Sequence, residues 1–274
     1  MKRFLAFFLV VLMLMPTCFA SFVATSDTFP EAGTCYVEIE TEVISTGGGP
    51  RGGRKATKEQ IEAAAKIHDT GISETQREAA RQKLGLSNST RATWTYLDGY
   101  IVYSQSTAAN CGPAAIQAAL KYINGYTPSQ SEIAYRCHTV QRGESYLDLD
   151  MGTHIYDMVN YINTQQSERT YVPQYRYTSS SGLGTDLFDA ITIYEVPPII
   201  GLAFDEEDGW FYDTGGHIMS VYGGMDDESR FALADPWIGY SGSGLAGDGI
   251  GWSYAKPYSL ILAAFESTEI GVMY

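Results

Sequence analysis

The chain is poor in basic residues and in charge overall. Lys and Arg number 18 against 32 Asp and Glu among 274 residues, which gives a formal net charge of −14. This balance disfavours a protein that binds phosphate backbones, so we expect no nucleic-acid partner. Charged residues make up only 18% of the chain and hydrophobic residues 45%. That composition excludes a disordered chain or a coiled coil and predicts a globular core.

Long apolar runs are absent except at the very start of the chain. The basic pair Lys2-Arg3 precedes an unbroken apolar run over residues 4–15, and a small residue, Ala20, ends the segment. This order is typical of a secretory signal peptide, and the run is short for a membrane span. We therefore predict a signal peptide over residues 1–20, a secreted or cell-surface protein, and no stable membrane span after cleavage. The alternative is an uncleaved N-terminal anchor.

Cysteine is also scarce, with four residues in all. Removal of the signal peptide leaves three cysteines, Cys35, Cys111 and Cys137. With an odd number of cysteines in an exported protein, at least one thiol is unpaired or forms a disulfide with another chain. Cys35 and Cys137 could form a disulfide if Cys111 is the free thiol. The sequence alone does not determine which cysteines pair. Cys137-His138 with His154 matches no recognised zinc spacing, so we predict no metal.

The segment over residues 21–98 differs in composition from the rest. Residues 46–54 are rich in glycine and arginine and indicate a flexible, protease-accessible linker, in which two Gly-Gly pairs are candidate self-cleavage sites. Two short helices follow, one capped by Thr57 and one by a capping box of Ser73 and Gln76. We predict a pro-segment or dispensable extension; the alternative is that the two helices pack on the back of the domain.

From Trp94 onward the chain is dense in aromatic and apolar residues. Apolar spacing predicts buried or amphipathic helices over residues 114–123 and 154–163. Apolar runs of strand length, separated by Gly, Asp and Pro, predict strands at residues 100–103, 198–204, 217–222, 230–234 and 258–265. Helices followed by antiparallel strands indicate an α+β domain over residues 99–274.

The strongest chemical signal is the Asn-Cys-Gly-Pro sequence at residues 110–113. Pro113 suits the first turn of a helix, which places Cys111 at the helix N-terminus, where the dipole and free N–H groups favour thiolate over thiol. Gly112 leaves room for a substrate to approach the sulfur. Gln105 lies six residues upstream, so its side-chain amide and the Cys111 N–H could bind an oxyanion.

A thiolate nucleophile needs a base, and His217 begins a strand after two glycines. If this strand and residues 230–234 form a hairpin, the register pairs position 217 with Asp235. A carboxylate there would fix the imidazole tautomer and stabilise the imidazolium. We predict that Cys111, His217 and Asp235 act as nucleophile, base and orienter, and that Trp237 shields the pair from water; the alternative is an inert buried thiol and a core histidine.

Gln105, Cys111, His217 and Asp235 occur in an order and at spacings that resemble the C39-like branch of papain-like cysteine peptidases. The resemblance covers roughly residues 99–274. It implies a papain-like fold, in which a helix carrying the cysteine packs on an antiparallel sheet carrying the histidine and aspartate. It also implies hydrolysis of peptide bonds without a cofactor.

The expected activity is therefore that of a secreted cysteine peptidase acting on a peptide or protein substrate. Acyltransferases and transglutaminase-like enzymes use the same set of catalytic residues but pass the acyl group to an amine instead of water. A catalytically inactive binding domain at the cell surface is the non-enzymatic alternative. The sequence does not indicate an oligomeric state.

Overall fold

A computed structural model describes residues 21–24, 49–66, 73–86, 92–144, 151–167, 169–245 and 252–274. The expected signal peptide and Cys35 lie outside these residues. The helices are α1 (Lys58–Ala64), α2 (Glu74–Lys83), α3 (Cys111–Asn124), α4 (Gln130–Arg136), α5 (Ile155–Gln165), α6 (Gly182–Asp189), a π-helix η1 (Ala190–Tyr194) and α7 (Tyr258–Glu266), with 3₁₀ turns η2 (Glu206–Asp208) and η3 (Ser241–Ser243).

The strands form one large sheet and one small one. The large sheet has the order β1-β3-β7-β6-β10-β5; off this path, β8 pairs with β7, and β9 pairs with β8. Its pairings are antiparallel, whereas β2 and β4 form a separate parallel pair. The strand bounds are β1 (Ser21–Ala24), β2 (Gly53–Arg54), β3 (Trp94–Leu97), β4 (Thr153–His154), β5 (Pro173–Gln174), β6 (Ile199–Phe204), β7 (Thr214–Met225), β8 (Arg230–Ala234), β9 (Ser253–Pro257) and β10 (Val272–Met273).

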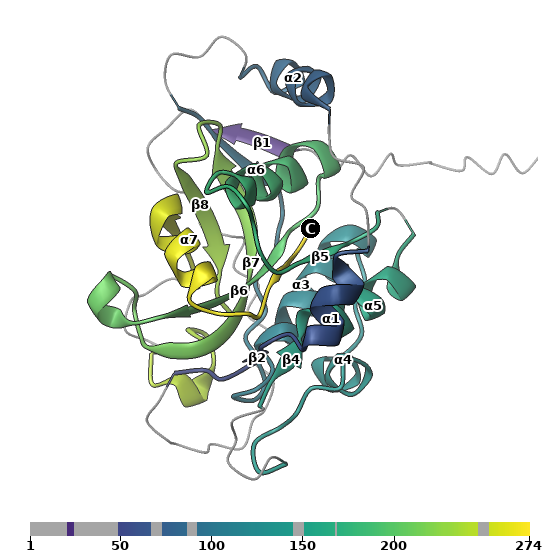
Figure 1. Cartoon of the computed structure of the whole chain (residues 1–274), viewed down its shortest axis with the longest axis vertical. Helices are drawn as coiled ribbons and strands as arrows, with labels where there is room; N and C mark the ends of the chain where they lie inside the picture. Colours follow the sequence, from purple (N-terminus) through teal and green to yellow (C-terminus); the bar gives the residue numbers. More distant parts are fainter. Residues whose placement is uncertain are drawn as a thin grey trace, which may run out of the picture.

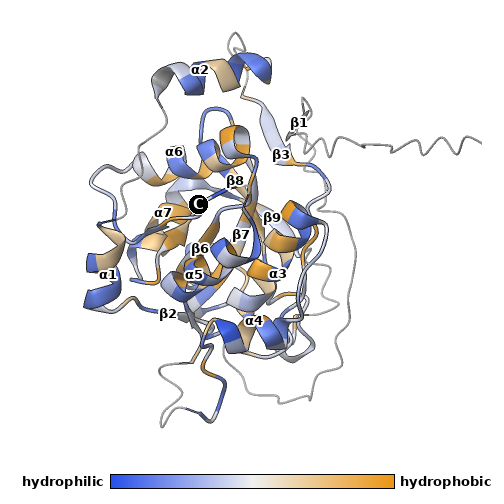
Figure 2. Ribbon diagram, turned by 90° about the vertical axis from the view of Figure 1, so that its right-hand side faces the viewer, coloured by the Kyte–Doolittle hydropathy of each residue, from blue (hydrophilic) through white to orange (hydrophobic). Residues whose placement is uncertain are grey.

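Helices and sheet form two layers with the core between them. Helices α3, α4 and α5 gather on one side of the molecule and the strands β6 to β8, with α7 in front of them, on the other (Figure 1). The central helix α3 packs against β7, α4 and α5, and almost all of its residues are buried. Hydrophobic residues lie at the centre, and α1 and α4 carry many polar residues (Figure 2). The fold is therefore α+β, as the sequence predicts.

Two of the predicted strands are wrong. Residues 258–265 form helix α7, because an apolar run of this length, with two alanines, suits a buried helix as well as a strand. Residues 100–103 are not one of the strands of the sheet. The strand in this region is β3, a few residues earlier. The strands expected at 198–204 and 230–234 correspond to β6 and β8, and both helices predicted from spacing are present as α3 and α5.

The N-terminal segment contributes to the sheet and packs on the domain. Both predicted caps are confirmed, with full capping boxes at Thr57 and Ser73. Strand β3, just inside the expected boundary at residue 98, pairs with β7, so the sheet begins before that boundary. Helix α2 is tied to the domain by the ion pair of Arg77 with Asp189, at 2.8 Å. The pro-segment role itself stays a prediction.

None of the helices in the described ranges has the length and apolar character needed to cross a bilayer.

Candidate active site

Cys111 is the first residue of α3 and is fully buried. The preceding residue, Asn110, makes no side-chain cap bond to the helix, and its side chain instead contacts Ser106 and Gln141. The first N–H groups of α3 are thus not capped by Asn110, which keeps the positive end of the helix dipole directed at the thiol. The position that the sequence predicts for this cysteine agrees with the structure.

Gly112 has a different role from the expected one. It is buried, and a Cβ on it would lie 3.1 Å from the Met158 Sδ and 3.1 Å from the Thr153 side chain. The missing side chain therefore lets α3 approach α5 and β4 closely.

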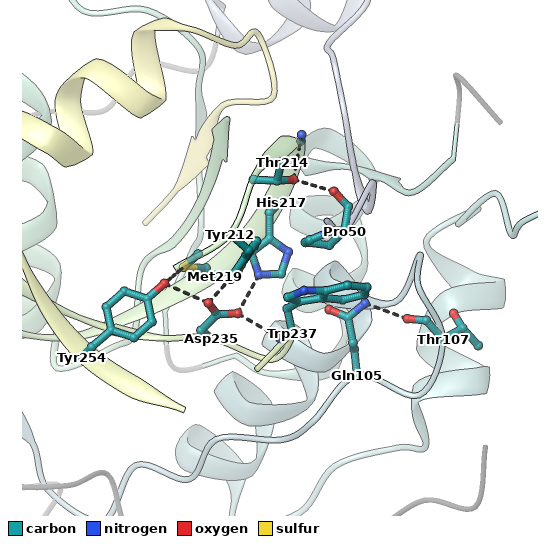
Figure 3. Close-up of polar contacts among 11 residues, drawn as sticks. Pro50, Gln105, Thr107, Tyr212, Thr214, His217, Met219, Asp235, Trp237 and Tyr254 are labelled. Atoms are coloured by element: carbon teal, nitrogen blue, oxygen red, sulfur yellow. Dashed lines mark hydrogen bonds and ion pairs between the residues drawn. The ribbon is translucent and has the colours of Figure 1, made fainter. Parts of the chain in front are cut away.

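His217 and Asp235 form a buried pair at the centre of the site (Figure 3). The imidazole Nε2 lies 2.8 Å from the Asp235 Oδ1, and both side chains are inaccessible to solvent. The imidazole Nδ1 has no hydrogen-bond partner among the described residues, and the Cys111 thiol lies near enough to the ring to raise the pKa of His217. The structure thus brings together the three residues that the sequence singled out.

The strand register that joins them is not the predicted one. In the hairpin of β7 and β8, Ser220 lies opposite Ala234 and Gly224 opposite Phe231, with a bulge between them. Continuing this register places Asp235 opposite Met219, two residues from His217. Because side chains alternate with a period of two, a shift of two residues keeps both groups on one face, within diagonal reach.

Asp235 accepts four hydrogen bonds, of which the sequence predicted only one. Its Oδ2 accepts from the hydroxyls of Tyr212, at 2.7 Å, and Tyr254, at 2.8 Å. Its Oδ1 also accepts from the backbone N–H of Trp237, at 2.9 Å. These donors compensate for the burial of the carboxylate. The two tyrosines come from the segment before β7 and from β9, and no local sequence pattern links them to Asp235.

The electrostatics of the pair favour a charged imidazole. Burial by itself lowers the pKa of His217, but the Asp235 carboxylate, the hydrogen bond to it and the nearby Cys111 thiol outweigh burial and raise that pKa to about 9. Burial and the same carboxylate hold the pKa values of Tyr212 and Tyr254 well above their usual range, so both stay protonated donors. The site therefore favours the imidazolium form of His217 near neutral pH, which is the form that results when the ring takes the proton of Cys111.

We expect stability to fall in mildly alkaline solution for this reason. A histidine whose pKa rises from 6.5 to about 9 on folding stabilises the protein fully below pH 6.5, and this contribution is lost as the pH rises through about 9. Urea unfolding at several pH values should show the decline in the wild type and lack it in His217→Asn. His138→Asn, which changes an exposed histidine, is the control. Equal pH slopes for the wild type and His217→Asn would contradict the expectation.

Gln105 lies beside the turn that leads into α3. Its backbone N–H donates to the carbonyl of Pro236, at 3.1 Å, which ties it to the segment that follows Asp235. Its side-chain Nε2 donates to the carbonyl of Thr107, at 2.7 Å (Figure 3). A primary amide carries two N–H donors, so one remains for a ligand.

The histidines and cysteines that the structure describes outside this set do not converge on a metal site. Within the described ranges, no group of three or more His, Cys, Asp and Glu side chains is placed to hold a metal ion. His138 faces Asp157 at 4.0 Å, and His154 is buried in β4. Cys137 is buried as well, and this burial raises the pKa of its thiol.

In this α+β fold, a buried Cys, His and Asp set lies between a helix N-terminus and an antiparallel sheet. Residues 97–245, more than half of the chain, match the family described as Peptidase_C39 like, and the chain belongs to this family. The matched range includes all four predicted site residues. A comparison with curated proteins finds no match.

Proposed function

We propose that the protein is a secreted cysteine peptidase in which Cys111 is the nucleophile, His217 the general base and acid, and Asp235 the orienting carboxylate. The single observation that carries the proposal is the bond between the His217 Nε2 and Asp235, which leaves Nδ1 for the buried thiol at the start of α3. Membership of a peptidase family supports a protein or peptide as substrate. The fold class is compatible with a papain-like arrangement.

The proposed reaction proceeds in two stages. His217 takes the proton of Cys111, and the thiolate attacks the carbonyl carbon of the peptide bond to give a tetrahedral oxyanion. The intermediate collapses when the imidazolium donates its proton to the leaving amine, which departs and leaves a thioester on Cys111. His217 then removes a proton from water, the hydroxide attacks the thioester, and the acid product leaves as the thiol regains its proton. Asp235 keeps the ring oriented throughout.

The test is hydrolysis of an unfolded protein substrate by the full chain, compared with Cys111→Ser. In ¹⁸O-labelled water, each new carboxyl terminus should carry the label, and an added primary amine should leave the products unchanged. Capture of the amine instead of water would identify the protein as an acyltransferase. Equal product formation by Cys111→Ser would overturn the proposal.

Gln105→Ala should lower kcat by about 10- to 1000-fold, with a smaller change in KM, because one donor to the oxyanion is lost. The measurement is steady-state hydrolysis at saturating substrate. Gln117→Ala serves as the control, since Gln117 is also buried on the helical side and bonds to the Pro128 carbonyl. Equal losses in the two variants would indicate a structural role for Gln105 only.

A further inference from the structure

A short segment of the chain passes directly between the two walls of the candidate active site. We call residues 49–55 the cleft segment. The N–H of Gly52 donates to the carbonyl of Gly216, at 2.9 Å, on the sheet side. The carbonyl of Gly52 accepts from the N–H of Thr153, at 2.7 Å, on the helical side. The backbone of Gly52 is thus bonded to both walls at once, immediately before His217 and immediately after Gly152.

Gly52 lies against the thiol of Cys111. It is buried, and a Cβ on it would overlap the Cys111 Sγ and lie 3.1 Å from the carbonyl oxygen of Ala109. No residue with a side chain can take this place while the thiol keeps its position. The backbone of Gly52 therefore covers the thiol on this side, and glycine is required for this contact.

Glycines on both walls of the cleft leave room for the backbone of the cleft segment. A Cβ at Gly152 would overlap the Gly52 carbonyl, and a Cβ at Gly216 would lie 2.7 Å from the Gly53 carbonyl oxygen. Gly53 and the next residue pair with β4 as strand β2, and the Thr214 hydroxyl donates to the Pro50 carbonyl (Figure 3). Glycines face the segment from both sides, so the cleft accommodates a peptide backbone in extended conformation.

Charge also favours this placement. The cleft segment carries three basic residues, Arg51, Arg54 and Lys55, in a chain with a net charge of −14. Lys55 lines a cavity of about 390 Å³ together with Asp205 and Asp208 and with the aromatic rings of Phe204 and Trp210. The acidic and aromatic lining is complementary to a basic side chain.

We propose that the cleft segment is an intramolecular inhibitor that occupies the substrate cleft and covers Cys111, so that the activity of the full chain stays low until the segment leaves. The inference rests on the proposed peptidase function for its biological meaning. The direction of the Gly52 carbonyl separates an inhibitor from a substrate. That carbonyl accepts from the N–H of Thr153, whereas the Gln105 amide that would hold an oxyanion donates to the Thr107 carbonyl, so the hydrogen bonds of the segment are not those of a bound substrate.

The first test is Gly52→Ala in the full chain. The added methyl group cannot share space with the Cys111 sulfur and should displace the segment, which raises the rate of Cys111 alkylation by iodoacetamide roughly ten-fold or more. Mass spectrometry of the peptide that contains Cys111 measures the rate apart from any peptidase activity. Arg51→Lys is the matched control, because it changes an exposed residue next to Gly52 and keeps its charge and backbone contacts.

Thr214→Val is a second variant, in case Gly52→Ala fails to fold. It removes the hydroxyl that donates to Pro50 and should raise alkylation by about two- to ten-fold, the value of one hydrogen bond. A synthetic peptide with the sequence of residues 49–55 should slow alkylation of either variant again. The same peptide with alanine in place of Gly52 should not.

The outcomes separate the two proposals. Faster alkylation together with faster hydrolysis of an unfolded substrate supports both. Faster alkylation without hydrolysis supports the covering of Cys111 and contradicts the peptidase function. Unchanged alkylation in a folded variant overturns the inference. Cleavage of the wild type between Gly52 and Gly53 that is absent in Cys111→Ala would also overturn it, because the segment would then be a substrate.

Discussion

Cys111→Ala and His217→Ala are each expected to lower kcat by about 10⁴- to 10⁶-fold, to the level of the uncatalysed reaction plus binding effects. The thiol and the imidazole act as one unit, so the loss in the double variant should equal that in either single variant. Steady-state hydrolysis of a peptide substrate measures the effect. Comparison in the Gly52→Ala background removes any contribution of the cleft segment to the rates.

Cys137→Ala is the control for the nucleophile. Cys137 is buried like Cys111 but ends helix α4 instead of beginning a helix, and burial raises the pKa of its thiol. We expect activity to be retained in this variant, and only stability to change. Full activity in His217→Ala would identify a different base, with His154 as the next residue to test.

Asp235→Ala is expected to lower both activity and stability. Removal of the carboxylate leaves the imidazole Nε2, the hydroxyls of Tyr212 and Tyr254 and the Trp237 N–H without their acceptor in a buried site. Loss of one partner of a buried charged pair costs about 3–5 kcal/mol of unfolding free energy. kcat should fall by about 10³- to 10⁴-fold, yet stay measurably above that of Cys111→Ala, since the orienter is not consumed in the reaction.

The double variant Tyr212→Phe with Tyr254→Phe separates the two effects. It removes both donors to Oδ2 and leaves the bond between His217 and Oδ1 in place. Each lost bond to the carboxylate should cost about 1.5–3 kcal/mol of stability. The loss in kcat should be much smaller than in Asp235→Ala. An equal loss in kcat would mean that Asp235 acts through packing and not through the imidazole.

Membership of a peptidase family and the position of the thiol could be read from short stretches of sequence, because the determinants are local. Pro113 suits the first turn of a helix, so the start of α3 and the place of Cys111 follow from neighbouring residues. The capping boxes at Thr57 and Ser73 are local for the same reason. The predicted register of the hairpin was wrong by two residues, yet His217 and Asp235 still lie on one face of the sheet. This is because side chains in a strand alternate with a period of two.

Other features depend on contacts between distant parts of the chain, and only the tertiary structure decided them. An apolar run of eight residues has no period that separates a strand from a buried helix, and packing made residues 258–265 into α7. The donors from Tyr212 and Tyr254 reach Asp235 from separate elements. The glycine-rich stretch has no core-forming residues and predicts a free linker by composition. Part of it lies instead against Cys111, because the same lack of side chains lets a backbone pass between two walls that are themselves lined with glycine.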